Sequence, residues 1–206
     1  MDRTRAVNAA DYAKLLVSIG AVELRTDPAT WFTWASGERA PIYCDNRLVM
    51  SYPAVRKKIA EGLADSIRRA YPDAEVIAGT ATAGIPHAAW VATLLDLPMI
   101  YVRGAAKEHG KGKRVEGRPL HGERVVLIED LVSFGGSALA AVEALEAEGG
   151  KVIGVQAIFT YGFPAAANRF AAAGKRVLAL TGYDALLETL ALDEPTRKIL
   201  LAWRER

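Results

Sequence analysis

Two adjacent carboxylates, Glu129 and Asp130, follow four apolar residues and precede a short loop of hydroxyl and glycine residues. The string reads Val125-Val126-Leu127-Ile128-Glu129-Asp130-Leu131-Val132-Ser133-Phe134-Gly135-Gly136-Ser137. A continuous apolar run is typical of a strand buried on both faces. Glycines that lead into a helix expose backbone N–H groups and the positive end of the helix dipole to a phosphate. The hydroxyls of Ser133 and Ser137 can add hydrogen-bond donors.

The carboxylate pair and the loop suit different parts of a phosphorylated sugar. Two carboxylates can accept hydrogen bonds from vicinal sugar hydroxyls, or stabilise a positive charge that develops nearby. For Glu129 and Asp130 alone, a solvated acidic strand end is the simpler interpretation, but the whole string favours a ligand site. A Walker A loop is excluded, because the pattern Gly-x4-Gly-Lys-Ser/Thr does not occur in the sequence.

The segment 103–118 is the second feature with chemical content, since it holds six basic residues, two acidic residues and four glycines. The basic residues are Arg103, Lys107, Lys111, Lys113, Arg114 and Arg118. Its excess of positive charge, within a chain whose formal net charge is only +2, predicts contact with an anionic ligand. Because glycine permits many backbone conformations, we expect a mobile basic loop. The near-neutral total argues against a broad nucleic-acid-binding surface.

Hydrophobic periodicity predicts the elements that position these residues. Apolar residues recur every four positions from Val55 to Tyr71, which predicts an amphipathic helix that begins near Pro53. A short helix is expected over 6–20, and irregular or hairpin structure over 22–47. Strands are expected at 75–79, 98–102, 124–129, 151–160 and 176–181, with helices at 84–96, 136–148 and 164–173 and two short C-terminal helices. This alternation predicts an α/β fold with a parallel sheet flanked by helices, and function beyond the carboxyl ends of the strands.

The composition fits one globular domain. The chain has 206 residues, of which 51% are hydrophobic and 24% charged. We expect a single domain over 1–206, with a small N-terminal hood over about 1–50 and an α/β core over about 51–206. A lone Cys44 cannot form an internal disulfide. Because no signal peptide or long apolar run is evident, the expected location is the cytoplasm, with no membrane or nucleic-acid partner.

The string from Val125 to Ser137 resembles the phosphoribosyl-diphosphate (PRPP) motif of the type I phosphoribosyltransferases. Further stretches resemble the orotate phosphoribosyltransferases within that family. They are Phe32-Thr33-Trp34-Ala35-Ser36-Gly37 with Pro41-Ile42-Tyr43-Cys44-Asp45-Asn46-Arg47, then Ala81-Thr82-Ala83-Gly84-Ile85-Pro86-His87, then Tyr101-Val102-Arg103 with Lys107-Glu108-His109-Gly110. The resemblance implies transfer of ribose 5-phosphate from PRPP to orotate, which yields orotidine 5'-phosphate and diphosphate in UMP biosynthesis.

The resemblance also implies roles for single residues. Glu129 and Asp130 would face the ribose hydroxyls, and Ser133 would also lie beside the pyrimidine with Tyr43 and Cys44. The PRPP-binding residues would further include Leu131, Val132, Ser133, Phe134, Gly135, Gly136 and Ser137, together with Arg103, Lys107 and His109 at the diphosphate. The expected catalytic residues are Lys107, His109 and Asp130. Mg²⁺ would arrive with PRPP rather than bind the protein directly, and loop 103–118 would act as a lid that reaches the partner's site in a homodimer.

The sequence departs from the family pattern at three places. Gly104 and Ala105 stand where many relatives have a lysine, and Phe134 replaces a small residue of the phosphate loop. The segment 159–163 lacks the arginine with which some relatives hold the orotate carboxylate. Selectivity for orotate must then come from the backbone near 42–45 or from Arg47. A phosphoribosyltransferase for another nucleobase and a non-catalytic PRPP-sensing regulator are the alternatives.

The remaining polar and aromatic residues are interpreted as structural. The turn 79–84 has the spacing Gly-x-Ala-x-x-Gly, but the acidic residue that a dinucleotide site needs about 20 positions later is missing. We interpret this turn as a small-residue loop at the diphosphate. His87 is expected to cap or pack a helix, Cys44 to be packed rather than nucleophilic, and Trp34 to pack in the core or at a dimer contact. The three histidines and one cysteine show no metal-ligand spacing.

Overall fold

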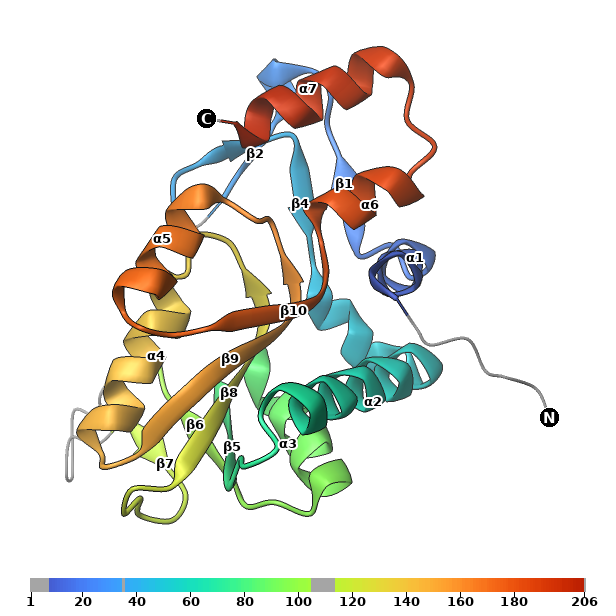
Figure 1. Cartoon of the computed structure of the whole chain (residues 1–206). Coiled ribbons are helices and arrows are strands. Elements are labelled where there is room, and N and C mark those ends of the chain that lie inside the picture. The colour runs from blue at the N-terminus through green and yellow to red at the C-terminus, as the bar shows by residue number, and fades with distance from the viewer. Residues whose placement is uncertain (1–7, 35, 105–113, 206) are drawn as a thin grey trace.

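The computed structural model of the chain describes residues 8–34, 36–104 and 114–205. Within them, six strands form one sheet in the order β10-β9-β8-β5-β6-β7 (Figure 1). The strands are β5 (Val76–Thr80), β6 (Met99–Val102), β7 (Val115–Glu116), β8 (Arg124–Val132), β9 (Lys151–Thr160) and β10 (Val177–Gly182). All neighbouring pairs are parallel except β6 and β7. The predicted parallel sheet is therefore confirmed.

Helices cover both faces of this sheet (Figure 1). One face carries α2 (Pro53–Ala70), α3 (Gly84–Leu95) and α1 (Ala9–Ser18), and the other carries α4 (Gly136–Ala147) and α5 (Pro164–Ala172). Side chains alternate along a strand. On β8, Val126 and Ile128 therefore join the core under α2 and α3, while Val125 and Leu127 join the core under α4. Two buried faces explain why this strand reads as an unbroken apolar run.

Two details of the sheet differ from the expectation. β8 runs on to Val132 rather than ending at Glu129, because Leu131 and Val132 continue the parallel pairing with Phe159 and Thr160 of β9. Asp130 is thus held by a strand, not by a loop. The antiparallel strand β7 was not predicted and lies inside the segment expected to be a mobile loop. A strand of only two residues is too short to show the alternation of apolar and polar side chains that predicts a strand.

The N-terminal segment forms a hood of short antiparallel pairs. β1 (Val22–Leu24) pairs with β4 (Ile42–Cys44), and β2 (Phe32–Thr33) pairs with β3 (Arg39–Ala40). Two 3-10 helices, η1 (Pro28–Thr30) and η2 (Asn46–Ser51), complete it.

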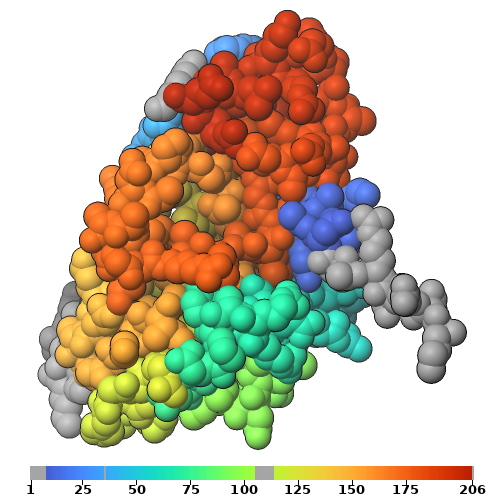
Figure 2. Space-filling model, in the orientation of Figure 1, coloured from blue at the N-terminus to red at the C-terminus, as the bar shows by residue number. Residues whose placement is uncertain are grey.

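The C-terminal helices α6 (Tyr183–Thr189) and α7 (Glu194–Arg204) lie against this hood, and α7 runs beside β2 (Figure 1). The indole N–H of Trp203 donates to the Arg39 carbonyl at 2.9 Å. In the space-filling view, the blue N-terminal residues lie between the red C-terminal segment and teal α2 (Figure 2). The N-terminal hood thus packs against the C-terminal helices, a long-range contact that no local sequence pattern predicts. No helix among the described residues is long and apolar enough to cross a lipid bilayer.

Candidate active site

The carboxyl end of β8 delivers the carboxylate pair to a cleft. Glu129 is only 4% exposed and Asp130 is partly buried. Residues 133–135 follow as a short loop, and α4 begins at Gly136. Gly135 has φ +79°, and a Cβ there would lie 2.7 Å from the Phe170 ring. Glycine is thus required at the point where the chain turns from the strand into the helix N-terminus.

Two adjoining clefts surround this turn. The first, of about 480 Å³, is lined by residues 131–138 together with Ser36, Glu38 and Arg169. The second, of about 370 Å³, contains both carboxylates and draws on the hood and on residues 80–83. Ser36, Leu131, Ser133 and Ser137 line both clefts, so the two are continuous. The glycine turn and the carboxylate pair thus open into one space.

Burial dominates the electrostatics of the pair. It raises the pKa of Glu129 to about 8, with a further contribution from the neighbouring Asp130. The Ser137 hydroxyl donates to Oε1 of Glu129 at 3.4 Å and opposes part of this shift. Burial also raises the pKa of Asp130, to about 6. Carboxylates with perturbed pKa values in a cleft are a signature of functional sites.

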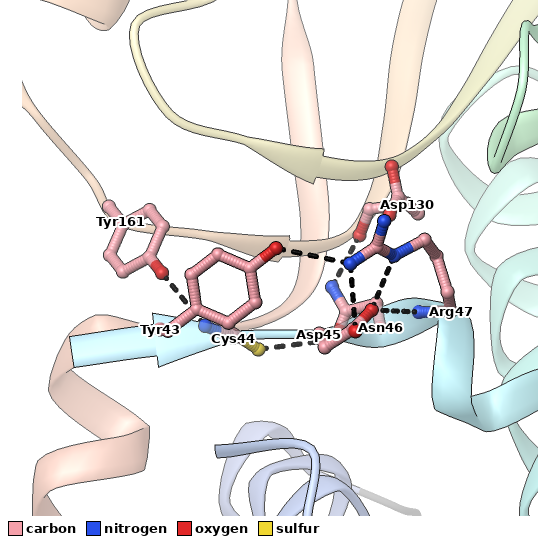
Figure 3. Close-up of polar contacts among 7 residues, drawn as sticks. All are labelled: Tyr43, Cys44, Asp45, Asn46, Arg47, Asp130 and Tyr161. Atoms are coloured by element: carbon pink, nitrogen blue, oxygen red, sulfur yellow. Dashed lines mark hydrogen bonds and ion pairs between the residues drawn. The ribbon is translucent and has the colours of Figure 1, made fainter. Parts of the chain in front are cut away.

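The hood places a second charged pair in the same cleft (Figure 3). Arg47 meets Asp45 through two bonds, from Nε to Oδ1 at 2.6 Å and from Nη2 to Oδ2 at 2.8 Å. Nη2 also donates to the Tyr43 hydroxyl at 3.1 Å. Asn46, only 1% exposed, donates from Nδ2 to the Asp130 carbonyl at 2.7 Å. Sequence reasoning missed Asn46, although a polar residue between charged neighbours at the end of an apolar strand was an available signal.

Cys44 is packed, as predicted. Its thiol donates to Oδ1 of Asn46 at 3.2 Å, and burial raises the thiol pKa, which makes the residue unsuitable as a nucleophile. The Cys44 backbone N–H donates to the Tyr161 hydroxyl at 3.2 Å (Figure 3). Tyr161, just beyond β9, also lines the second cleft and was not predicted. Its only sequence signal was its place in an aromatic run after a strand.

An aromatic cluster accommodates Phe134 in the phosphate loop. Its ring stacks on Phe163, with centroids 4.6 Å apart and planes 11° apart, and meets Trp34 edge-on at 6.5 Å. Trp34 in turn packs 4.6 Å from Tyr161, and its indole N–H donates to the Ile42 carbonyl at 3.2 Å. The unusual Phe134 is therefore held by packing. Trp34 packs in the same cluster, as predicted, but it also lines the second cleft, where it could stack on a ligand.

Small residues line the turn between β5 and α3. A Cβ at Gly84 would lie 2.5 Å from the Ile128 carbonyl oxygen, so only glycine lets this turn approach β8. Residues 80–83 line the second cleft. His87 is fully buried in α3 and edge-on to Trp90 at 5.3 Å. Burial lowers its pKa to about 4, which makes it a neutral packing residue, as predicted.

Of the residues expected at the diphosphate, Arg103 is the one that the structure describes. Arg103 lies at the end of β6 with Nη1 3.8 Å from Glu116, and it lines neither cleft. Its backbone N–H donates to the Arg114 carbonyl at 2.8 Å, which joins the two described ends of the basic segment. Lys107 and His109, as well as Ala105, lie outside the described residues.

A mostly parallel sheet whose central strand carries a buried and a partly buried carboxylate near its carboxyl end, followed by a glycine turn into a helix, defines a phosphoribosyltransferase of the type I fold. Residues 51–169 match the phosphoribosyl transferase domain family. The chain is 55% identical over 197 residues to the orotate phosphoribosyltransferase of Enterococcus faecalis, covering 94% of this chain and 93% of that one. It is 54% identical over 199 residues to that of Bacillus caldolyticus, with 95% of each chain covered. The chain belongs to the orotate phosphoribosyltransferases.

Solved structures agree with this assignment. Orotate phosphoribosyltransferase from Aeropyrum pernix superposes with a TM-score of 0.75 at 31% identity, covering 85% of this chain and 96% of that one. UMP synthase from Leishmania donovani superposes with a TM-score of 0.79 at 28% identity, covering 96% of this chain but 42% of that one. The fold resemblance suggested by the PRPP motif is thus confirmed along most of the chain.

Proposed function

We propose that this protein transfers ribose 5-phosphate from PRPP to orotate and releases orotidine 5'-phosphate and diphosphate, a step of pyrimidine biosynthesis. The observation that supports it most is the junction of the Glu129–Asp130 pair with the glycine turn into α4, in one continuous cleft. The relatives with 54–55% identity that are named orotate phosphoribosyltransferase support the choice of orotate.

In this proposal the chemistry is positioning and charge stabilisation. Glu129 and Asp130 accept hydrogen bonds from the ribose hydroxyls and stabilise the oxocarbenium-like transition state. The loop from Ser133 to Ser137 holds the 5-phosphate through backbone N–H groups and the α4 dipole. No covalent nucleophile is needed, because the bound pyrimidine can attack C1 of the ribose as its anion. Held side by side, the two substrates gain the advantage of proximity.

The basic segment 103–118 serves as the lid over the diphosphate. Arg103, Lys107 and His109 are the proposed contacts, and Lys107 and His109 the groups with the largest effect on turnover. Several positive charges around a leaving diphosphate stabilise it as its bond to C1 breaks. The closed lid also excludes water. The backbone bond between Arg103 and Arg114 holds together the two points at which such a lid would join the sheet.

Magnesium belongs to this proposal as a companion of PRPP. Glu129 and Asp130 offer the carboxylate oxygens that Mg²⁺ prefers, but two carboxylates fall short of its six-ligand shell. The ion would therefore be held mainly by PRPP rather than directly by the protein, with the two carboxylates facing the ribose to which the diphosphate is attached. When bound, the ion neutralises charge on the leaving diphosphate.

A single assay tests the proposed function. Purified protein is incubated with Mg²⁺ and PRPP and with orotate, uracil, adenine or hypoxanthine in parallel, and base consumption is followed. We expect consumption of orotate alone. Consumption of a different base would favour a phosphoribosyltransferase for that base, and PRPP binding with no turnover would favour a sensor. The variant Lys107→Ala should lose most of its turnover while its unfolding temperature stays unchanged.

We further propose a cytoplasmic homodimer of single-domain subunits, each with a hood over about 1–50 and a core over about 51–206, whose lids reach the partner's site. Mixing the inactive variants Lys107→Ala and Asp130→Asn tests the shared lid. If the lid crosses, half of the mixed dimers' sites are intact, which restores about a quarter of the wild-type activity. Activity that stays at the level of the separate variants would place lid and carboxylates in the same subunit.

A further inference from the structure

Orotate differs from uracil by one carboxylate, so an enzyme that selects orotate needs a cation for it. The segment 159–163 offers none. Among the described residues that line the cleft of Glu129 and Asp130, Arg47 is the only side chain with a fixed positive charge. We propose, on the basis of the proposed function, that Arg47 binds the orotate carboxylate by exchanging its bonds to Asp45 for bonds to the substrate.

The backbone of the same segment is already committed to other partners. The Cys44 N–H donates to the Tyr161 hydroxyl at 3.2 Å, and the Asp45 N–H donates to the Ala21 carbonyl at 2.7 Å. The Ile42 carbonyl accepts from the Trp34 indole at 3.2 Å. Residues 42–44 also pair with β1. Of the two sources of selectivity that the sequence left open, the backbone thus has its N–H groups at Cys44 and Asp45 already in use. The Arg47 side chain also has partners, but it is half-exposed and lines the cleft, so it can exchange them for a substrate.

Asp45 shows that the Arg47 guanidinium already has the orientation that a carboxylate requires. The pair is bidentate, at 2.6 and 2.8 Å, which is the geometry of strong arginine–carboxylate recognition (Figure 3). The Arg47 side chain is 55% exposed and that of Asp45 27%. An ion pair this open to water contributes about 1 kcal/mol or less. A substrate carboxylate can thus replace Asp45 at little cost.

The position of Arg47 also matches the chemistry of the substrate. The carboxylate of orotate sits on the ring carbon next to the nitrogen that attacks the ribose, so its cation must lie beside the ribose-binding carboxylates. Figure 3 shows the guanidinium between Tyr43 and Asp130. Asn46, the residue before Arg47, holds the Asp130 carbonyl at 2.7 Å. This bond sets the distance between the base-binding and ribose-binding parts of the cleft.

The test is a change in selectivity rather than a simple loss of activity. For Arg47→Gln we expect kcat/KM for orotate to fall about 100-fold, the value for one lost charge-assisted contact of about 3 kcal/mol. KM for PRPP should stay within about twofold, since Arg47 makes no contact with the phosphate loop. Orotate affinity, measured calorimetrically, should fall toward that of uracil, whose affinity should not change. Arg47→Lys, which keeps the charge, should recover part of the orotate affinity.

Arg68→Gln is the matched control. Arg68 is 53% exposed and pairs with Asp65 at 2.7 Å, but it lies on α2 outside the cleft. The variant Arg68→Gln should keep the wild-type kcat/KM for orotate and the wild-type KM for PRPP. If Arg47→Gln keeps wild-type orotate kinetics, or loses orotate and uracil affinity equally, the assignment of Arg47 is wrong while the proposed function stands. A wild-type protein that consumes no orotate overturns the proposed function, and the Arg47 assignment with it.

Discussion

Glu129 and Asp130 are neighbours in sequence, yet the strand gives them different surroundings. Both line the cleft, but Glu129 is almost fully buried beside Ser137, while Asp130 is only partly buried and lies within electrostatic reach of Arg47. Burial therefore raises the pKa of Glu129, to about 8, more than it raises that of Asp130, to about 6. At neutral pH and without substrate, the pair holds a proton. Ligand groups that donate hydrogen bonds or carry positive charge favour its release.

This raised pKa predicts how stability depends on pH. Because the folded pKa of Glu129 is above the unfolded value of about 4.3, the folded state holds an extra proton between these values. Its stabilising contribution is complete below pH 4 and is lost as the pH rises through about 8. From pH 6.5 to 8, we expect the unfolding temperature of the substrate-free protein to fall by about 3 °C per pH unit. Differential scanning fluorimetry measures this slope.

The variant Glu129→Gln should abolish most of that slope, because it removes the titrating group. Glu61→Gln, on the exposed surface of α2, is the control and should keep the wild-type slope. His87 contributes a slope of opposite sign between its folded pKa of about 4 and its unfolded value of about 6.5, so its effect fades above pH 6.5 and is the same in wild type and variant. An identical slope in wild type and Glu129→Gln would contradict the assigned pKa.

At the scale of elements, the site depends on how β8 passes into α4. The loop at residues 133–135 turns within three residues, with Gly135 in the left-handed region at the helix N-cap. The first residues of α4, from Gly136 to Ala138, line the first cleft, and the N–H groups of a first helical turn have no partner within the helix. Phe134, which also lines this cleft, braces the turn by stacking on Phe163.

Gly135→Ala should therefore weaken PRPP binding. The new Cβ would meet the Phe170 ring at 2.7 Å in a backbone region that side chains disfavour, so the loop must move. We expect KM for PRPP to rise about tenfold or more, in line with a loss of about 1.4 kcal/mol. Steady-state kinetics at saturating orotate measures it.

Gly174→Ala is the matched control for this substitution. Gly174 also has a positive φ, +63°, but has no atom within 4 Å of the new Cβ and lies beyond α5, outside both clefts. It should lose about 1 kcal/mol of stability and keep its KM for PRPP. Equal effects of the two variants on KM would mean that the loop geometry is not what binds PRPP.

At the scale of the whole molecule, the cleft forms where two ends of the chain meet the sheet. Trp203 of α7 lies 5.5 Å from Trp34 of the hood and 5.9 Å from Tyr161 beyond β9. Its indole also holds the Arg39 carbonyl. The C-terminal helix thus braces the hood segment that supplies Tyr43 and Arg47 to the cleft.

Trp203→Ala should consequently affect stability and orotate binding together. Loss of this buried ring is expected to cost about 3–5 kcal/mol of unfolding free energy, measured by urea denaturation. KM for orotate should rise more than KM for PRPP, because the phosphate loop belongs to the core rather than to the hood. Trp203→Phe, which keeps a ring and loses only the bond to Arg39, should cost about 1 kcal/mol. A rise confined to KM for PRPP would contradict this coupling.

The α/β sheet, the glycine turn and the family could all be predicted from the sequence, because each is marked by residues that are neighbours along the chain. Short apolar runs of four or five residues, a four-residue helical repeat and the Glu-Asp-to-glycine string are all visible along the chain. The strand predicted to end at Glu129 continues for three more residues, to Val132, because it pairs there with β9. A neighbouring strand is invisible to a local pattern.

Which polar groups of the hood are exposed to a substrate in the cleft could be seen only in the tertiary structure. Asn46 meets Asp130, 84 positions away, and the Cys44 N–H meets Tyr161, 117 positions away. Such contacts depend on how the hood folds over the sheet and leave no spacing in the sequence. They commit the backbone near residue 44, while the Arg47 guanidinium, bonded to Asp45 and to the Tyr43 hydroxyl, lines the cleft and stays half-exposed.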